Sequence, residues 1–292
     1  IMTNAIIPEF QLDEKTHPGN VALKVNNLQK MIAFYTQIIG LKLLQQETQQ
    51  AVLGAGNTPL LYLFQINGQR AAQQRTGLYH TAFLLPTRKD LGNALIRYVS
   101  TNAPLSGAAD HIYSEALYLT DPEGNGIEVY HDKPRSEWII KEDGEIPSDT
   151  LEMDVEGVLK AADQKWTGFP DNTMVGHIHL SVSDVNQTQD FYTKILGLSL
   201  KFNFGEAAKF LATGGYHHHI GTNVWMSRNA APLAKNETGL KYYSFYVPDS
   251  AELDRIAEHL TSLSIEFEQA DNGQITFIDP SGIQGRFEIQ PS

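Results

Sequence analysis

Hydrophobic and polar residues near the start of the chain follow two different periods in succession. In residues 21–25, apolar side chains alternate with polar or small ones, which is typical of a half-buried strand. In residues 28–39, apolar side chains recur at i, i+3, i+4 and i+7, which predicts an amphipathic helix. Asn26 or Asn27 can cap the start of this helix, and Gly40 can end it. The segment therefore reads as one strand followed by one helix.

The same strand and helix recur in the second half of the chain. Residues 178–182 and 185–196 repeat the pattern at an offset of 157 residues, with Asp184 as the cap and Gly197 as the stop. Two further anchors recur at nearly the same offset, and they are Thr-Gly-Leu at 76 and 238 and Asp-Pro at 121 and 279. Amphipathic segments over 91–99 and 253–263 supply two more helices.

Four repeats of strand, helix and three strands (βαβββ) therefore account for most of the chain, which predicts an α+β fold. We expect an N-terminal extension over 1–17, a first domain over 18–132 with modules 1 and 2, and a second domain over 175–292 with modules 3 and 4. Residues 133–174 form an acidic connector that is expected to hold one helix around 151–162.

Polar side chains gather on one face of the predicted strands. Because side chains alternate across a strand, the apolar set at 178, 180 and 182 places His177, His179 and Ser181 together on the opposite face. The same argument points other strand residues at an interior, namely Asn20, His80 and Glu128 in the first half and Tyr242 and Glu288 in the second. Imidazoles and a carboxylate that converge in a pocket are typical of a divalent metal site. The alternative is a set of interior histidines that hydrogen-bond to glutamate.

Composition narrows the chemistry. The 292 residues include 22 Lys and Arg against 34 Asp and Glu, a net charge of −12, which disfavours nucleic acid and anionic membranes as partners. With no cysteine, a metal site must use His, Asp, Glu or Tyr. No apolar run approaches the roughly 20 residues of a membrane span, and the first residues do not resemble a signal peptide. We expect a cytoplasmic protein with a small molecule as its substrate or ligand, and a homo-oligomer stays an open alternative.

Several motifs resemble those of one known family. They are Gly176-His177-Ile178-His179, Phe-Tyr followed by Gly-Leu in both halves, and Asp121-Pro-Glu-Gly-Asn-Gly-Ile-Glu128. Together with the repeated modules they resemble the vicinal oxygen chelate superfamily of glyoxalases, bleomycin resistance proteins and extradiol dioxygenases. The segments 114–119, 130–134 and 214–221 resemble its two-domain, catechol 2,3-dioxygenase-like branch. The resemblance implies two tandem glyoxalase-like domains, each a half-open barrel.

The resemblance also implies a metal site in the second half. Its extradiol members bind iron(II) through His, His and Glu, which map to His177, Tyr242 and Glu288. The tyrosine departs from the family pattern, so Tyr242 is expected to contact the metal or the substrate. Iron(II) is the implied metal, manganese, nickel and zinc are the alternatives, and a chain without metal is a further one.

The histidine run at 217–219 offers a replacement for the missing imidazole. We expect His218 to act as an acid or base toward the substrate and His219 as a further metal ligand, with His217 and His219 on one face of a strand. In the first half, Asn20, His80 and Glu128 are expected to form a vestigial site, and His111 is a candidate addition to it.

Three functions remain open from the sequence. The first is an iron(II)-dependent dioxygenase that cleaves the ring of catechol or hydroquinone compounds, as in aromatic compound degradation. The second is a small-molecule binding protein without a working metal, which the substitutions at Asn20 and Tyr242 favour. The third is a glyoxalase-like lyase or isomerase, which needs an additional carboxylate ligand.

Overall fold

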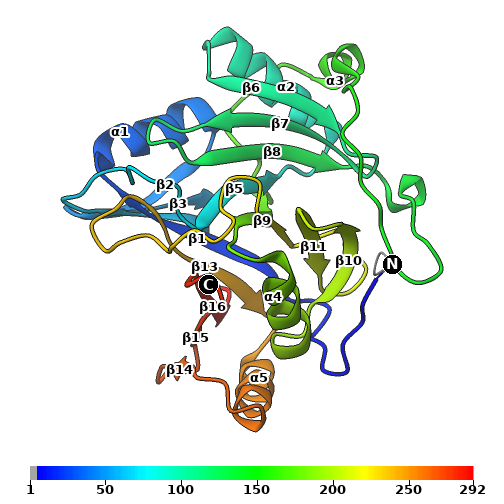
Figure 1. Ribbon diagram of the computed structural model, residues 1–292. Coiled ribbons are helices and arrows are strands. Elements are labelled where there is room, and N and C mark those ends of the chain that lie inside the picture. The colour runs from blue at the N-terminus through cyan, green and yellow to red at the C-terminus, as the bar shows by residue number, and fades with distance from the viewer. Residues whose placement is uncertain (1–4, 292) are drawn as a thin grey trace.

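A computed structural model describes residues 5–291 and contains the four predicted modules (Figure 1). The first module consists of β1 (His17–Val25), α1 (Leu28–Ala33), the π-helical turn η1 (Phe34–Ile39), β2 (Lys42–Gln46), β3 (Gln50–Ala55) and β4 (Thr58–Gln65). The second consists of β5 (Gly77–Leu84), α2 (Arg88–Ser100), β6 (Leu105–Asp110), β7 (Ser114–Thr120) and β8 (Gly126–Asp132).

The second half repeats this order after a connector that holds η2 (Arg135–Glu137) and α3 (Val155–Ala161). The third module consists of β9 (Met174–Ser181), α4 (Val185–Asp190), η3 (Phe191–Ile195), β10 (Ser199–Phe204), β11 (Ala208–Ala212) and β12 (Ile220–Asn223). The fourth consists of β13 (Gly239–Val247), α5 (Ser250–Ser262), β14 (Glu268–Gln269), β15 (Ile275–Ile278) and β16 (Gln284–Ile289). The predicted α+β fold of four βαβββ modules and the connector helix are confirmed.

The first helix of each half begins and ends where the sequence predicts. The side chain of Asn27 accepts a hydrogen bond from the backbone N–H of Lys30, and Asp184 caps α4 in the same way. The turns after these helices end at Gly40 and Gly197, whose φ values of 121° and 89° suit glycine. In both halves the last turn widens into a π-helix.

The modules pair into sheets differently from the prediction. One eight-stranded sheet has the order β14-β15-β16-β13-β1-β4-β3-β2, so it joins modules 4 and 1. The other has the order β10-β11-β12-β9-β5-β8-β7-β6 and joins modules 3 and 2. The expectation that modules 1 and 2 share one interior, and modules 3 and 4 another, is therefore wrong. The first strand of every module has an edge that must pair with another strand. Strand periodicity does not say which strand that is.

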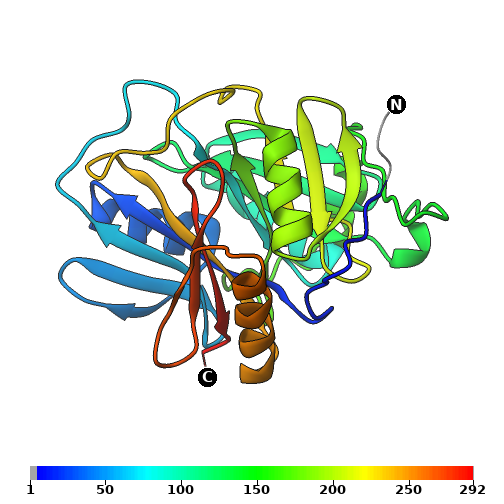
Figure 2. The same ribbon diagram turned by 60° about the horizontal axis from the view of Figure 1, so that its bottom comes forward.

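At the centre of each sheet, the first strands of its two modules pair antiparallel, β1 with β13 and β5 with β9. Figures 1 and 2 show the helices of the modules outside the two curved sheets, with α4 and α5 on neighbouring parts of the surface. One hydrophobic core runs through both sheets and includes Val21, Phe83, Ile178 and Phe245, one residue from each module. The domain boundaries at 18–132 and 175–292 stay a prediction about the sequence repeat, and residues 1–4 and 292 lie outside the described chain. Within residues 5–291, no helix has the length and apolar character needed to cross a membrane.

Candidate metal site and substrate cavity

Three neighbouring strands of the second sheet place His177 and Glu128 opposite each other. In the register of β9, β5 and β8, His177 pairs with Ala82 and Ala82 pairs with Glu128. The small Ala82 side chain leaves the two larger ones free to meet above it. Gly176 adds to this fit, because a Cβ at that position would lie 1.8 Å from the Tyr130 hydroxyl. The glycine before the histidine therefore makes room for a tyrosine ring beside His177.

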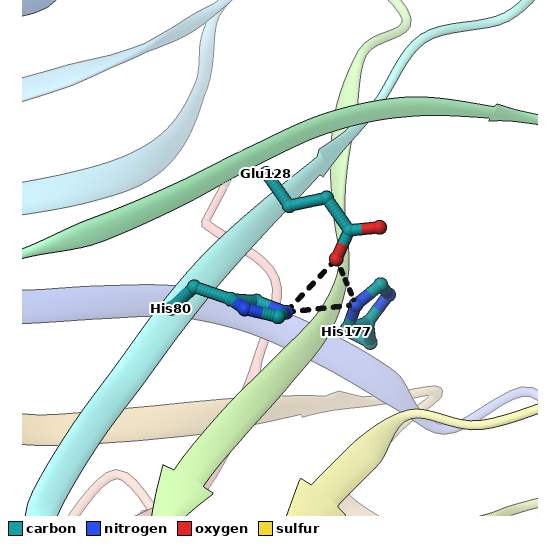
Figure 3. A group of neighbouring side chains, drawn as sticks. All are labelled: His80, Glu128 and His177. Carbon is teal, nitrogen blue, oxygen red and sulfur yellow. Dashed lines mark hydrogen bonds and ion pairs between the residues drawn. The ribbon is translucent and has the colours of Figure 1, made fainter. Parts of the chain in front are cut away.

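His80 completes a compact group with these two residues (Figure 3). It lies two positions before Ala82 on β5, so it faces the same side of the sheet. Oε2 of Glu128 lies 2.7 Å from Nε2 of His177 and 2.8 Å from Nε2 of His80. The two Nε2 atoms are 3.3 Å apart. Three potential ligand atoms from β5, β8 and β9 thus converge on one point, and all three side chains are buried.

The surroundings keep the His177 imidazole neutral and the Glu128 carboxylate ionised. Burial lowers the pKa of His177 to about 4 despite the opposing effect of Glu128. Burial acts to raise the pKa of Glu128, but the two adjacent imidazoles more than offset it and hold that pKa well below its usual range. At neutral pH the group is therefore an anionic carboxylate beside a neutral imidazole, which is the protonation state that a metal ion requires of its ligands.

The donor set fits a divalent cation. Ligand atoms about 2.1 Å from an ion and at right angles lie about 3.0 Å from one another, and the three measured separations bracket that value. Two imidazoles and one carboxylate on one side of an ion leave its other positions open. His177 Nδ1 is buried without a hydrogen-bond partner among the described residues. Within residues 5–291 this is the one group of three or more such side chains with metal-binding spacing.

The expected ligands Glu288 and Tyr242 lie in the other sheet and do not approach His177. Glu288 accepts a hydrogen bond from Nδ2 of Asn20 (2.8 Å), which also donates to the Tyr246 hydroxyl (3.1 Å). Burial raises the pKa of Tyr242 to about 12, and the Arg286 guanidinium lies 3.5 Å from the centre of its ring. The structure therefore does not bring Glu288 and Tyr242 together with His177, and it places His80 and Glu128 beside His177 instead.

The physical reason is the module pairing. Because module 3 pairs with module 2, His177 meets His80 and Glu128. Because module 1 pairs with module 4, Asn20 meets Glu288, and the expected vestigial set of Asn20, His80 and Glu128 is not formed. All three members of the buried group were predicted from the sequence to face an interior, but two of them, His80 and Glu128, were assigned to a vestigial site.

The histidine run lies in a loop between β11 and β12, not in a strand as expected. His218 enters the site, and its ring centre is 4.1 Å from that of His177. Nδ1 of His219 accepts a hydrogen bond from the backbone N–H of Thr213 (3.1 Å), and its ring stacks on Tyr216. His219 is therefore held by structural contacts, whereas His218 faces the candidate metal-binding group of His80, Glu128 and His177.

A chain of hydrogen bonds orients His218. The carboxylate of Asp132 accepts a hydrogen bond from Nε2 of His217 (2.7 Å), so a neutral His217 has its lone pair on Nδ1. Nδ1 of His218 lies 2.8 Å from that atom and must be the donor. A neutral His218 therefore carries its own lone pair on Nε2. The His218 ring lines the cavity, and Nε2 is the ring nitrogen that can interact with a molecule bound there. Burial, with His177 nearby, lowers the pKa of His218 well below its ordinary value.

A cavity of about 590 Å³ opens above the metal-binding group. On one side, His111 and Tyr118 are hydrogen-bonded to each other, and the Tyr118 hydroxyl donates to Oε1 of Glu128 (3.3 Å). His111 thus joins the site through Tyr118. Most of the cavity wall was not anticipated from the sequence, and it consists largely of aromatic residues: Tyr79, Tyr113, Phe202, Phe204, Phe210 and Trp225. Four of them, Tyr79, Phe202, Phe204 and Phe210, lie in strands, where aromatic side chains usually belong to the core, so their signal in the sequence was weak.

Both halves of the chain match the model of one known protein family. The family model of the Glyoxalase/Bleomycin resistance protein/Dioxygenase superfamily matches residues 17–129 and 174–287. The chain belongs to this superfamily. Its resemblance to the vicinal oxygen chelate proteins, inferred from the repeated motifs, is therefore confirmed.

One relative in this superfamily is the catechol-2,3-dioxygenase of Bacillus subtilis (strain 168). It is 41% identical over 266 residues, which cover 89% of this chain and 93% of the relative. The chain is thus a homologue of a dioxygenase, as the resemblance implied, and the match runs through both halves.

Solved structures share the fold at low sequence identity. A protein of Bacillus subtilis subsp. subtilis str. 168 superposes with a TM-score of 0.65 at 14% identity, covering 98% of this chain and 87% of its own. Glyoxalase I from Zea mays superposes with a TM-score of 0.57 at 12% identity, covering 94% and 92%. At these identities the likeness concerns the fold alone.

Proposed function

We propose that the protein is a metal-dependent dioxygenase that cleaves the ring of catechol-type aromatics, with His80, His177 and Glu128 as the metal ligands. The observation that carries the proposal is the convergence of three ligand atoms within 3.3 Å of one another at a buried point that opens into a cavity. The relationship to a catechol-2,3-dioxygenase supports the reaction type. Two imidazoles and one carboxylate are also the ligand set of non-haem iron(II) oxygenases, which supports iron as the metal.

The reaction consumes one catechol and one dioxygen. The ring carbon–carbon bond beside one hydroxyl-bearing carbon breaks, and both oxygen atoms enter the product as aldehyde and carboxylate oxygens. The ring supplies the four electrons that reduce dioxygen, so no other reductant is needed. A bound iron(II) ion would supply a chelation site for the two neighbouring hydroxyl oxygens and a path for these electrons.

The protein's own residues bind and orient the substrate. His218, with its lone pair on Nε2, is placed to accept a proton from one catechol hydroxyl. Tyr118 and His111 line the cavity beside Glu128, where the Tyr118 hydroxyl donates to Oε1 and so orients the carboxylate. The aromatic wall excludes water from the ring that is being opened.

Anaerobic reconstitution with ferrous iron, followed by addition of catechol and air, tests this proposal. We expect one iron per chain, oxygen uptake equal to the catechol consumed, and a coloured ring-opened product. His177→Ala should abolish both iron binding and turnover, whereas His259→Ala, a change on the partly buried surface of α5, should preserve both.

Two outcomes would contradict the proposal. If catechol binds with equal affinity to the wild type and to His177→Ala, and no iron is retained, the protein is a metal-free binding protein. If iron is retained but no catechol or hydroquinone is oxidised, the ring-cleaving activity is wrong while the metal site stands.

A further inference from the structure

The described lining of the cavity offers no lysine or arginine to an acidic substrate. It contains two carboxylates, Glu128 and Asp149. The carboxylate of Glu128 is directed at His80 and His177. A carboxylate on the substrate would therefore lose its water and meet no cationic side chain, which is unfavourable.

The histidines of the cavity do not make up for this. Nε2 of His177 and Nε2 of His80 already face Oε2 of Glu128, at 2.7 and 2.8 Å. His179 is also engaged, because its Nε2 lies 2.9 Å from Nδ2 of Asn223. The positive charge of a bound metal ion would be offset by the two catechol oxygens that it binds, so it would not stabilise a carboxylate elsewhere on the substrate.

One wall of the cavity is apolar and runs from the metal-binding group to the surface. Phe210 contacts the ring of His218 at 5.1 Å between centres, and Phe202 stacks on Phe210 at 5.9 Å. Phe204 and Trp225 continue this wall at the mouth, where they are 57% and 50% exposed. Large aromatic side chains exposed together at a cavity mouth are uncommon without a ligand to cover them.

The size of the cavity points the same way. About 590 Å³ lies in the range that holds drug-sized ligands, which is more than a single six-membered ring requires. The hydroxyl-bearing edge of the ring would lie at His80, His177 and Glu128, so a group attached to one of the other ring carbons would extend along Phe202 and Phe210 toward Trp225. An apolar substituent would bury this wall, whereas a charged one would not.

On the basis of the proposed function, we propose that the preferred substrate is an uncharged catechol with an apolar substituent, such as a second ring or a branched alkyl group, seated against Phe202, Phe210 and Trp225. Catechols that carry a carboxylate are then poor substrates. The metal-binding group sets the reaction, and this wall sets the choice among catechols.

The test compares substrates that differ in one property. With the iron-loaded enzyme, kcat/KM is measured for catechol, 3-phenylcatechol, 3,4-dihydroxyphenylacetate and the methyl ester of that acid. We expect the ester to exceed the acid by about 10- to 100-fold and 3-phenylcatechol to exceed catechol by about tenfold. Equal values for acid and ester, or a preference for the acid, would overturn the proposal.

Variants of the mouth provide a second measurement. Trp225→Ala should lower the ratio of kcat/KM for 3-phenylcatechol to kcat/KM for catechol by about tenfold. Met226→Ala is the matched control, because Met226 is the neighbouring residue, is 71% exposed and does not line the cavity. Quenching of tryptophan fluorescence by 3-phenylcatechol should be present in the wild type and weak in Trp225→Ala, which reports binding without turnover.

These measurements separate the two proposals. If no catechol is cleaved but 3-phenylcatechol still quenches Trp225 more strongly than the acid does, the proposed function fails and the substrate class stands. If catechol is cleaved but Trp225→Ala and Met226→Ala behave alike, the substrate class fails and the proposed function stands.

Discussion

Glu128 and Glu288 occupy corresponding strands of the two sheets, yet their partners give them different chemistry. Glu128 faces two imidazole nitrogens at 2.7 and 2.8 Å. Glu288 accepts a hydrogen bond from the amide of Asn20. An amide donates a hydrogen bond but is a weak metal ligand beside an imidazole, so one carboxylate sits in a set that could hold a metal ion and the other in a hydrogen-bonded, structural one.

This difference predicts the outcome of a matched pair of substitutions. Glu128→Gln should weaken the affinity for ferrous iron or for zinc by about 100-fold or more, since it removes a ligand, and loss of a residue that only supports a ligand already costs 10- to 100-fold. Glu288→Gln should leave the affinity within about twofold of the wild type. Metal titration followed by calorimetry checks both. Weakened binding in Glu288→Gln alone would place the site in the other sheet.

The sequence predicted which residues face an interior better than it predicted which of them meet. Strand parity correctly turned His80, Glu128 and His177 toward an interior, because alternation depends only on neighbours in the chain. It could not tell that His177 and His80 face each other, since that contact depends on the pairing of β9 with β5 across 97 residues. Tyr242, which departs from the ligand pattern of the family, lies on β13 in the other sheet and so is not beside His177.

At the scale of elements, one hydrogen bond explains why each half repeats Phe-Tyr and Asp-Pro. The Tyr35 hydroxyl, in the turn after α1, donates to Oδ2 of Asp121 (2.6 Å), which begins the turn between β7 and β8. In the second half the Tyr192 hydroxyl donates to Asp279 (3.0 Å) in the same way. Each bond joins a helix of one sheet to a turn of the other, so the repeated motifs connect the two sheets.

Removal of one such hydroxyl should destabilise the protein measurably. Tyr35→Phe leaves the buried Asp121 carboxylate one donor short, and we expect the free energy of unfolding to fall by about 1 to 3 kcal/mol. Tyr62→Phe is the control, because its hydroxyl makes no hydrogen bond to another described residue, and its effect should stay within about 0.5 kcal/mol. Urea unfolding of both variants decides the matter, and equal stabilities would mean that this bond contributes nothing net.

At the scale of the whole molecule, the two halves of the chain are interleaved. Each sheet takes two modules from different halves, so neither half holds a complete sheet. The connector is exposed at residues 163–165, where a protease site can be inserted. After cleavage there, we expect the two fragments to co-elute in gel filtration and to retain the metal. Fragments that separate without denaturant would show that the halves are independent domains.

The extent of correct prediction follows the range of the interactions. Helix caps and the faces of the strands depend on residues close together in the chain and were predicted from local periodicity, and the order of the modules was predicted from the repeated motifs. The pairing of β1 with β13 and the course of the histidine loop depend on distant contacts, and no local pattern encodes them. The aromatic wall is of the same kind, since Tyr79 and Trp225 meet only in the folded chain.

The pairing of β1 with β13 also has a consequence during synthesis of the protein. The two strands begin about 220 residues apart, so at 5 to 20 residues per second the open edge of β1 waits roughly 10 to 45 s for its partner to leave the ribosome. During that time the edge offers unpaired N–H and C=O groups and apolar side chains to any other extended chain. Nascent chains of this protein should therefore be good clients for ribosome-associated chaperones, and misassembly should increase when many copies are translated side by side.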